Sequence, residues 1–132
     1  MRSYISLFLP EALKHLSMVR RVSREMLDSF GVSLQDIDDI ESLVGELTTN
    51  AARHARSSFY RVEVELSETQ AVVTVSDHGI GFQRSLLPGP EGRYRGWGLP
   101  LVERLADRVE FLPSLPHGVI VRAEKLLRPM PR

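Results

Sequence analysis

Three short blocks of residues able to do chemistry follow one another along the chain. The first combines an acid, an amide and an imidazole, the second a carboxylate and two glycines, and the third two glycines and a leucine. Their members are Glu46, Asn50 and His54, then Asp77, Gly79 and Gly81, then Gly96, Gly98 and Leu99. Together such groups can hold a nucleotide, a divalent metal and a reacting hydroxyl, so the first hypothesis is an ATP site.

The first block has the spacing of a helix face. Residues four apart lie on one side of a helix, so Glu46, Asn50 and His54 are expected to form a polar column. An amide oxygen such as that of Asn50 is a hard ligand suited to magnesium. A carboxylate such as Glu46, one turn earlier, can orient or deprotonate an attacking hydroxyl. Taken alone, the block also fits a solvated helix face that ends in a capping histidine.

The second block follows a predicted strand. Alternation puts Asp77 on the same sheet face as Val73 and Val75, and a buried carboxylate needs a partner. The exocyclic amine of adenine is one candidate, and Gly79 and Gly81 allow backbone to approach a ligand closely. The alternative is a glycine-rich turn in which Asp77 caps its own backbone.

The third block opens a predicted helix. Gly96 and Gly98 precede Leu99, and Pro100 is tolerated in a first helical turn. The start of a helix presents unpaired N–H groups and a positive dipole end, which favour a phosphate. The alternative is a tight turn without a ligand.

Hydrophobic periodicity predicts the elements that position these blocks. Strands are expected over 3–9, 61–66, 71–76, 109–112 and 119–125, and helices over 10–30, 33–54 and 99–107. Ser33, with Asp36 three residues later, is a predicted helix N-cap. Residues 83–95 are rich in Pro, Gly, Arg and Ser, as in a loop. The fold class is therefore α+β: a two-layer sandwich with a mostly antiparallel sheet covered by helices on one face. One domain is expected over 1–127, with a disordered tail over 128–132.

Composition limits the function classes. With 132 residues the chain has the size of one domain, and the absence of cysteine excludes disulfides and thiolate metal sites. Lys plus Arg and Asp plus Glu each number 17, so the net charge of zero favours neither nucleic-acid nor membrane binding. The apolar stretch 5–9 is too short for a membrane span or a signal peptide. A cytoplasmic location is expected.

The three blocks resemble the N, G1 and G2 boxes of the GHKL (histidine kinase-like) ATPase superfamily, which includes gyrase B, MutL, heat-shock chaperones and histidine-kinase catalytic domains. The resemblance covers nearly the whole chain and implies the Bergerat ATP-binding fold. The segments Glu46–Ala55 and Gly98–Asp107 look most like the small anti-sigma-factor serine/threonine kinases.

That resemblance implies a role for each position. Glu46 would be the catalytic base, Asn50 the ligand of Mg²⁺, and Asp77 the contact of the adenine amine. The other expected positions in the ATP pocket are His54, Gly79, Gly81, Gly96, Gly98 and Leu99. One departure stands out: many family members open the last strand with Gly-Thr-Thr, whereas this chain reads Gly118-Val119-Ile120, without the hydroxyl that supports adenine.

The function implied is an ATP- and Mg²⁺-dependent serine/threonine kinase that acts as an anti-sigma factor in bacterial partner switching. Its partners would be a sigma factor and an anti-anti-sigma (antagonist) protein, and a homodimer is implied, with the edge of the N-terminal strand a possible contributor. The basic cluster Arg20, Arg21 and Arg24 is either a docking surface or a solvated helix face. The alternative function is a nucleotide-gated partner-binding module of the same fold with negligible kinase activity.

Overall fold

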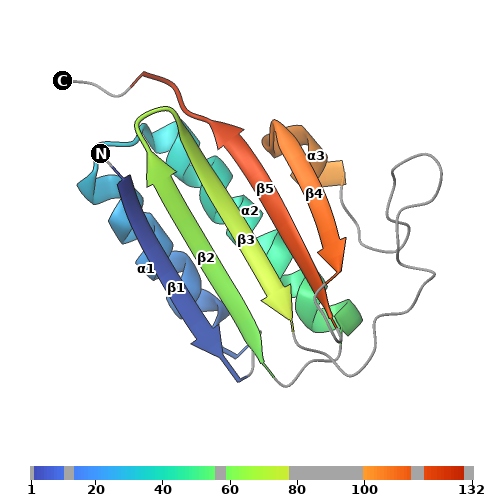
Figure 1. Ribbon diagram of the computed structural model, residues 1–132. Helices are drawn as coiled ribbons and strands as arrows, with labels where there is room; N and C mark the ends of the chain where they lie inside the picture. Colours follow the sequence, from blue (N-terminus) through green and yellow to red (C-terminus); the bar gives the residue numbers. More distant parts are fainter. Residues whose placement is uncertain (1, 11–13, 56–58, 78–99, 114–117, 130–132) are drawn as a thin grey trace.

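The computed structural model describes residues 2–10, 14–55, 59–77, 100–113 and 118–129. In these residues a five-stranded sheet forms one layer and helices cover one of its faces (Figure 1). The strands are β1 (Arg2–Leu9), β2 (Tyr60–Ser67), β3 (Gln70–Asp77), β4 (Arg108–Pro113) and β5 (Val119–Leu126), and the helices are α1 (Leu16–Ser29), α2 (Leu34–Ala55) and α3 (Pro100–Leu105). The predicted α+β sandwich is confirmed.

The sheet order is β1-β2-β3-β5-β4, and every described pair of strands is antiparallel. Valine-rich β2 and β3 form the predicted hairpin, in which Val62 lies opposite Val75 and Val64 opposite Val73. These four side chains are buried because alternation turns them toward the helices. The core therefore lies between the sheet and the helix layer.

The long helix α2 forms the centre of the helix layer. Its apolar side chains recur three and four residues apart, which keeps one stripe turned to the core. The fully buried members of this stripe are Ile37, Ile40, Leu43, Val44 and Leu47. The backbone N–H of Asp36 donates to the Oγ of Ser33 at 3.2 Å, so the predicted N-cap is confirmed.

Two predicted helix boundaries are wrong. The first helix begins at Leu16 rather than at Pro10; its first turn closes where the N–H of Val19 donates to the carbonyl of His15 at 3.0 Å. The helix therefore starts where its side chains reach the core, since Val19 is fully buried. Helix α3 ends at Leu105 rather than at Asp107, because the N–H of Asp107 donates to the carbonyl of Glu124 on β5 at 2.8 Å.

The end of the chain is tied to the start of α2. The carboxylate of Asp36 is 1% exposed and accepts the backbone N–H of Arg128 at 2.8 Å. The guanidinium of Arg128 also pairs with this carboxylate. Arg128, the first residue of the predicted disordered tail, is thus fixed, whereas residues 130–132 lie outside the described part of the chain and their disorder stays a prediction.

Strand β1 forms one edge of the sheet, and within the described ranges it pairs with β2 alone. An edge of this kind leaves backbone groups available for a further strand. Dimerisation through this edge remains a prediction. None of the described helices is long and apolar enough to cross a membrane.

Candidate nucleotide-binding site

The C-terminal ends of α2 and β3 and the beginning of β5 lie at the same end of the sandwich (Figure 1). This arrangement follows from the antiparallel pairing of β3 with β5, which puts the last residues of one strand beside the first residues of the other. Asp77 ends β3 at this end of the molecule, and α2, which carries Glu46 and Asn50, runs toward it (Figure 1).

Asp77 is the most constrained of the predicted site residues. It is 1% exposed and lies on the helix-facing side of the sheet with Val73 and Val75, as the alternation predicts. Its Oδ2 accepts the backbone N–H of Val119 at 3.2 Å. One partner of the carboxylate is therefore a strand 42 residues further along the chain.

Gly118 allows this close approach of β5. Its φ of +108° lies in the region that favours glycine. A Cβ at residue 118 would overlap the backbone carbonyl oxygen of Asp77 and lie 3.0 Å from its Oδ1. Sequence reasoning noted Gly118 only as part of a turn and a motif. A glycine immediately before a valine-rich strand was the signal that could have indicated a close backbone contact.

Val119 takes part in the site through its backbone. Its side chain is 2% exposed and belongs to the core cluster, while its N–H supports the carboxylate of Asp77. The departure from the Gly-Thr-Thr pattern therefore leaves this main-chain hydrogen bond intact, because the bond needs no side-chain hydroxyl.

Asn50 carries a buried amide with an unused donor. The residue is 2% exposed, and among the described residues its Nδ2 has no hydrogen-bond partner. A buried polar group without a partner is costly, so this side chain is suited to contact a ligand or an ion. Because rotation of the amide exchanges its nitrogen and oxygen, the side chain can also present an oxygen to Mg²⁺. Asn50 therefore fits the metal that the resemblance implies.

Glu46 lies one helical turn before Asn50 on the same side of α2. The residue is half-buried, and in the described part of the chain no ion pair neutralises its carboxylate. A half-buried carboxylate without a cationic partner can accept a proton from a bound hydroxyl.

The remaining predicted positions cannot be placed in space. His54 belongs to α2, but its side chain lies outside the described part. Residues 78–99 are also outside it, and they include the other five positions, Gly79, Gly81, Gly96, Gly98 and Leu99. Asp77 thus lies at the end of β3, and Glu46 and Asn50 share α2, while all nine site assignments stay predictions.

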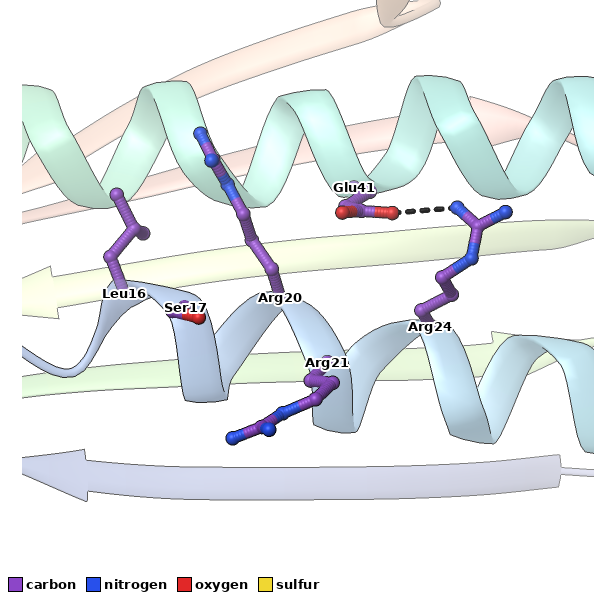
Figure 2. Close-up of a pocket in the computed structure, with 6 residues that line it drawn as sticks. All are labelled: Leu16, Ser17, Arg20, Arg21, Arg24 and Glu41. Carbon is purple, nitrogen blue, oxygen red and sulfur yellow. Dashed lines mark hydrogen bonds and ion pairs between the residues drawn. The ribbon is translucent and has the colours of Figure 1, made fainter.

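A second polar feature is an open groove of about 540 Å³ between α1 and α2 (Figure 2). Arg24 lines this groove, and its guanidinium donates to Asp38 at 2.9 Å and to Glu41 at 2.7 Å. Hydrogen bonds to these two carboxylates raise the pKa of Arg24 above its ordinary value. Arg20 also lines the groove, whereas Arg21 at its edge points away from α2.

A model of the histidine kinase-like ATPase domain matches residues 9–125 of this chain. The chain belongs to this family, as its three blocks predict. Within the family it groups with the small anti-sigma-factor serine kinases. It is 31% identical to the anti-sigma F factor of Pasteuria penetrans over 108 residues, which cover 73% of this chain and 72% of that protein. It is 30% identical to the serine-protein kinase RsbW of Bacillus licheniformis, over 94% of this chain and 86% of that one.

Two solved structures share the fold. The RsbU and RsbW domains of Rv1364c from Mycobacterium tuberculosis match with a TM-score of 0.68 and 22% identity, over 96% of this chain and 34% of that one. The SiaB–SiaC complex from Pseudomonas aeruginosa matches with a TM-score of 0.66 and 12% identity, over 92% of this chain and 89% of that one. At these identities the likeness concerns the fold.

Proposed function

We propose that this protein is an ATP- and Mg²⁺-dependent serine/threonine kinase that acts as an anti-sigma factor in a partner-switching pathway. The observation that carries the proposal is the buried amide of Asn50, which has no hydrogen-bond partner in the described residues. It lies one turn from Glu46, whose carboxylate forms no ion pair within those same residues. Similarity to proteins named anti-sigma F factor and serine-protein kinase RsbW supports the same function.

Each described site residue has one task in this proposal. Asp77, whose carboxylate is oriented by the N–H of Val119, accepts a hydrogen bond from the exocyclic amine of adenine. Asn50 binds Mg²⁺, which when bound neutralises charge on the phosphates. Glu46 orients the serine or threonine hydroxyl of the antagonist and accepts its proton.

We assign the docking of a partner protein to the groove between α1 and α2. Within the described residues, Arg20 forms no ion pair, so its positive charge is available in the groove for a partner's carboxylate. Charge complementarity of this kind raises the rate of association and helps to exclude wrong partners.

The proposal is tested by phosphotransfer. The purified protein is incubated with Mg²⁺, ATP labelled in the γ-phosphate and candidate antagonist proteins, and label in serine or threonine of one antagonist is the expected result. Glu46→Gln should retain ATP binding, and its rate of phosphotransfer should be lower by a factor of about 10² or more. A Glu46→Gln variant that transfers at the wild-type rate would contradict the role given to this carboxylate.

A nucleotide-gated binding module is the second candidate function. Val119 and Ile120 stand where many family members have threonines, so a side-chain hydroxyl that supports adenine is missing. If the protein binds ATP and a partner but transfers no label to any candidate antagonist, this second function is favoured.

A further inference from the structure

Gly45 is an unexpected residue for its position. It is buried in the middle of α2, a helix of 22 residues. Glycine is among the poorest residues for a helix interior because it has the most backbone freedom to lose. A glycine at this place therefore needs a reason, and the adjacent helix α1 supplies one.

The side chain of Arg20 lies where a side chain at residue 45 would be. A Cβ there would be 2.8 Å from Nε and 3.0 Å from Cζ of Arg20, and closer still to its Nη2. These three nearest atoms all belong to one guanidinium group. Figure 2 shows Arg20 reaching from α1 across α2. The missing side chain of Gly45 is thus a notch in α2 that Arg20 fills.

We propose that Gly45 is a positioning residue for partner recognition: its notch holds the Arg20 guanidinium over the α1–α2 groove, ready for a carboxylate of an acidic partner segment. This inference rests on the proposed function, because it assumes that a partner docks in this groove. Gly45 itself touches no partner and acts through Arg20.

Arg20 and Arg24 are held in different ways. Arg24 is fixed by charge, because it pairs with both Asp38 and Glu41. Arg20 is fixed by packing against α2, and in the described part of the chain no carboxylate neutralises it. Its charge therefore stays available to a ligand. A long side chain that is already held in place loses less conformational freedom on binding, which favours affinity.

The variant Gly45→Ala should change partner binding without lowering the stability of the fold. The atoms that its Cβ would meet form the far end of a long, exposed side chain, so the new methyl group would displace Arg20 and leave the core as it is. Alanine also has the higher helix propensity. The variant should therefore melt at or above the wild-type temperature and still bind partners more weakly.

The test uses a short peptide of alternating glutamate and alanine as the probe of the groove. The peptide is titrated into the protein, and the dissociation constant is taken from NMR shifts of the α1 amides. Gly45→Ala should weaken peptide binding by about three- to tenfold. It should cause no further loss in an Arg20→Ala background. In an Arg21→Ala background, which serves as the matched control, Gly45→Ala should keep its full effect.

Three results would overturn the inference: wild-type affinity in Gly45→Ala, an equal loss from Gly45→Ala when Arg20 is already alanine, or no peptide binding by the wild-type protein. Failure of the proposed function is separate, because it appears as absent ATP binding and absent phosphotransfer in the wild-type protein. If the protein phosphorylates an antagonist but Gly45→Ala leaves the peptide dissociation constant unchanged, only the role of Gly45 would be refuted.

Discussion

The backbone N–H of Val119 donates a hydrogen bond to the Oδ2 of Asp77 at 3.2 Å, and this bond joins the first residue of β5 to the last residue of β3. It fixes the orientation of a buried carboxylate without using any side chain of β5. The adenine contact proposed for Asp77 therefore depends on how closely the two strands approach each other, and Gly118 controls that approach.

Gly118→Ala is expected to destabilise the fold by about 3 kcal/mol, because a Cβ there is strained by the positive φ and overlaps the backbone of Asp77. Urea unfolding followed by circular dichroism measures this loss. Gly31→Ala is the matched control: its φ is +76°, but its Cβ would meet no atom within 4 Å. The control should lose about 1 kcal/mol from strain alone. Equal losses in the two variants would argue against the close contact at Asp77.

Asp77→Asn should retain the fold, since the amide oxygen can still accept the N–H of Val119. It should lower ATP affinity by about tenfold or more, because the second acceptor and the negative charge are removed. Calorimetry gives the affinity. Asp107→Asn is a suitable control, since Asp107 accepts the N–H of Leu126 at the other end of β5. An Asp77→Asn variant that binds ATP as tightly as Asp107→Asn would refute the adenine contact.

Asn50→Ala should abolish the part of ATP affinity that depends on Mg²⁺ and leave the affinity in EDTA almost unchanged. The free energy of unfolding should change by only about 1 kcal/mol, because the lost packing is offset by removal of an unpaired donor. Thr48→Val is the control: it removes a buried hydroxyl that also has no partner in the described residues. This variant should keep the Mg²⁺ effect on ATP affinity and be more stable than the wild type. Retention of the full Mg²⁺ effect in Asn50→Ala would contradict its role as a ligand.

Arg128→Ala should lower stability by about 1 to 2 kcal/mol, since the buried carboxylate of Asp36 would keep only the backbone N–H as its partner at this end of the chain. Thermal unfolding measures the change. Arg108→Ala removes the pairs of an exposed arginine with Glu110 and Glu124 on the sheet and should cost less than about 0.5 kcal/mol. If Arg128→Ala lowered the free energy of unfolding no more than Arg108→Ala does, the contact between Arg128 and Asp36 would not contribute to stability.

Much of the fold could be predicted because the local signals agree with the tertiary structure. The alternation of valines predicted the hairpin of β2 and β3, and Ser33 predicted the start of α2. The start of α1 was misplaced, since Pro10 suits a helix start but the helix begins at Leu16, and its first buried residue is Val19. The end of α3 was misplaced for a related reason, because the hydrogen bonds of Asp107 to β5 join residues distant in sequence.

The candidate site was predictable only in part. Glu46, Asn50 and Asp77 could be placed because helix and strand periods assign each residue to a face. The contact between Gly118 and Asp77 was missed, since a single glycine says nothing about which distant strand lies against it. The notch at Gly45 was missed for the same reason: its partner, Arg20, lies on another helix.

The most direct test of the central claim is a calorimetric titration of the purified protein with ATP, in the presence and absence of Mg²⁺. A site built from Asp77 and Asn50 predicts binding that strengthens with Mg²⁺ and weakens in Asp77→Asn. No binding in either condition would contradict the account, and the three blocks would then be the scaffold of a partner-binding domain without a nucleotide.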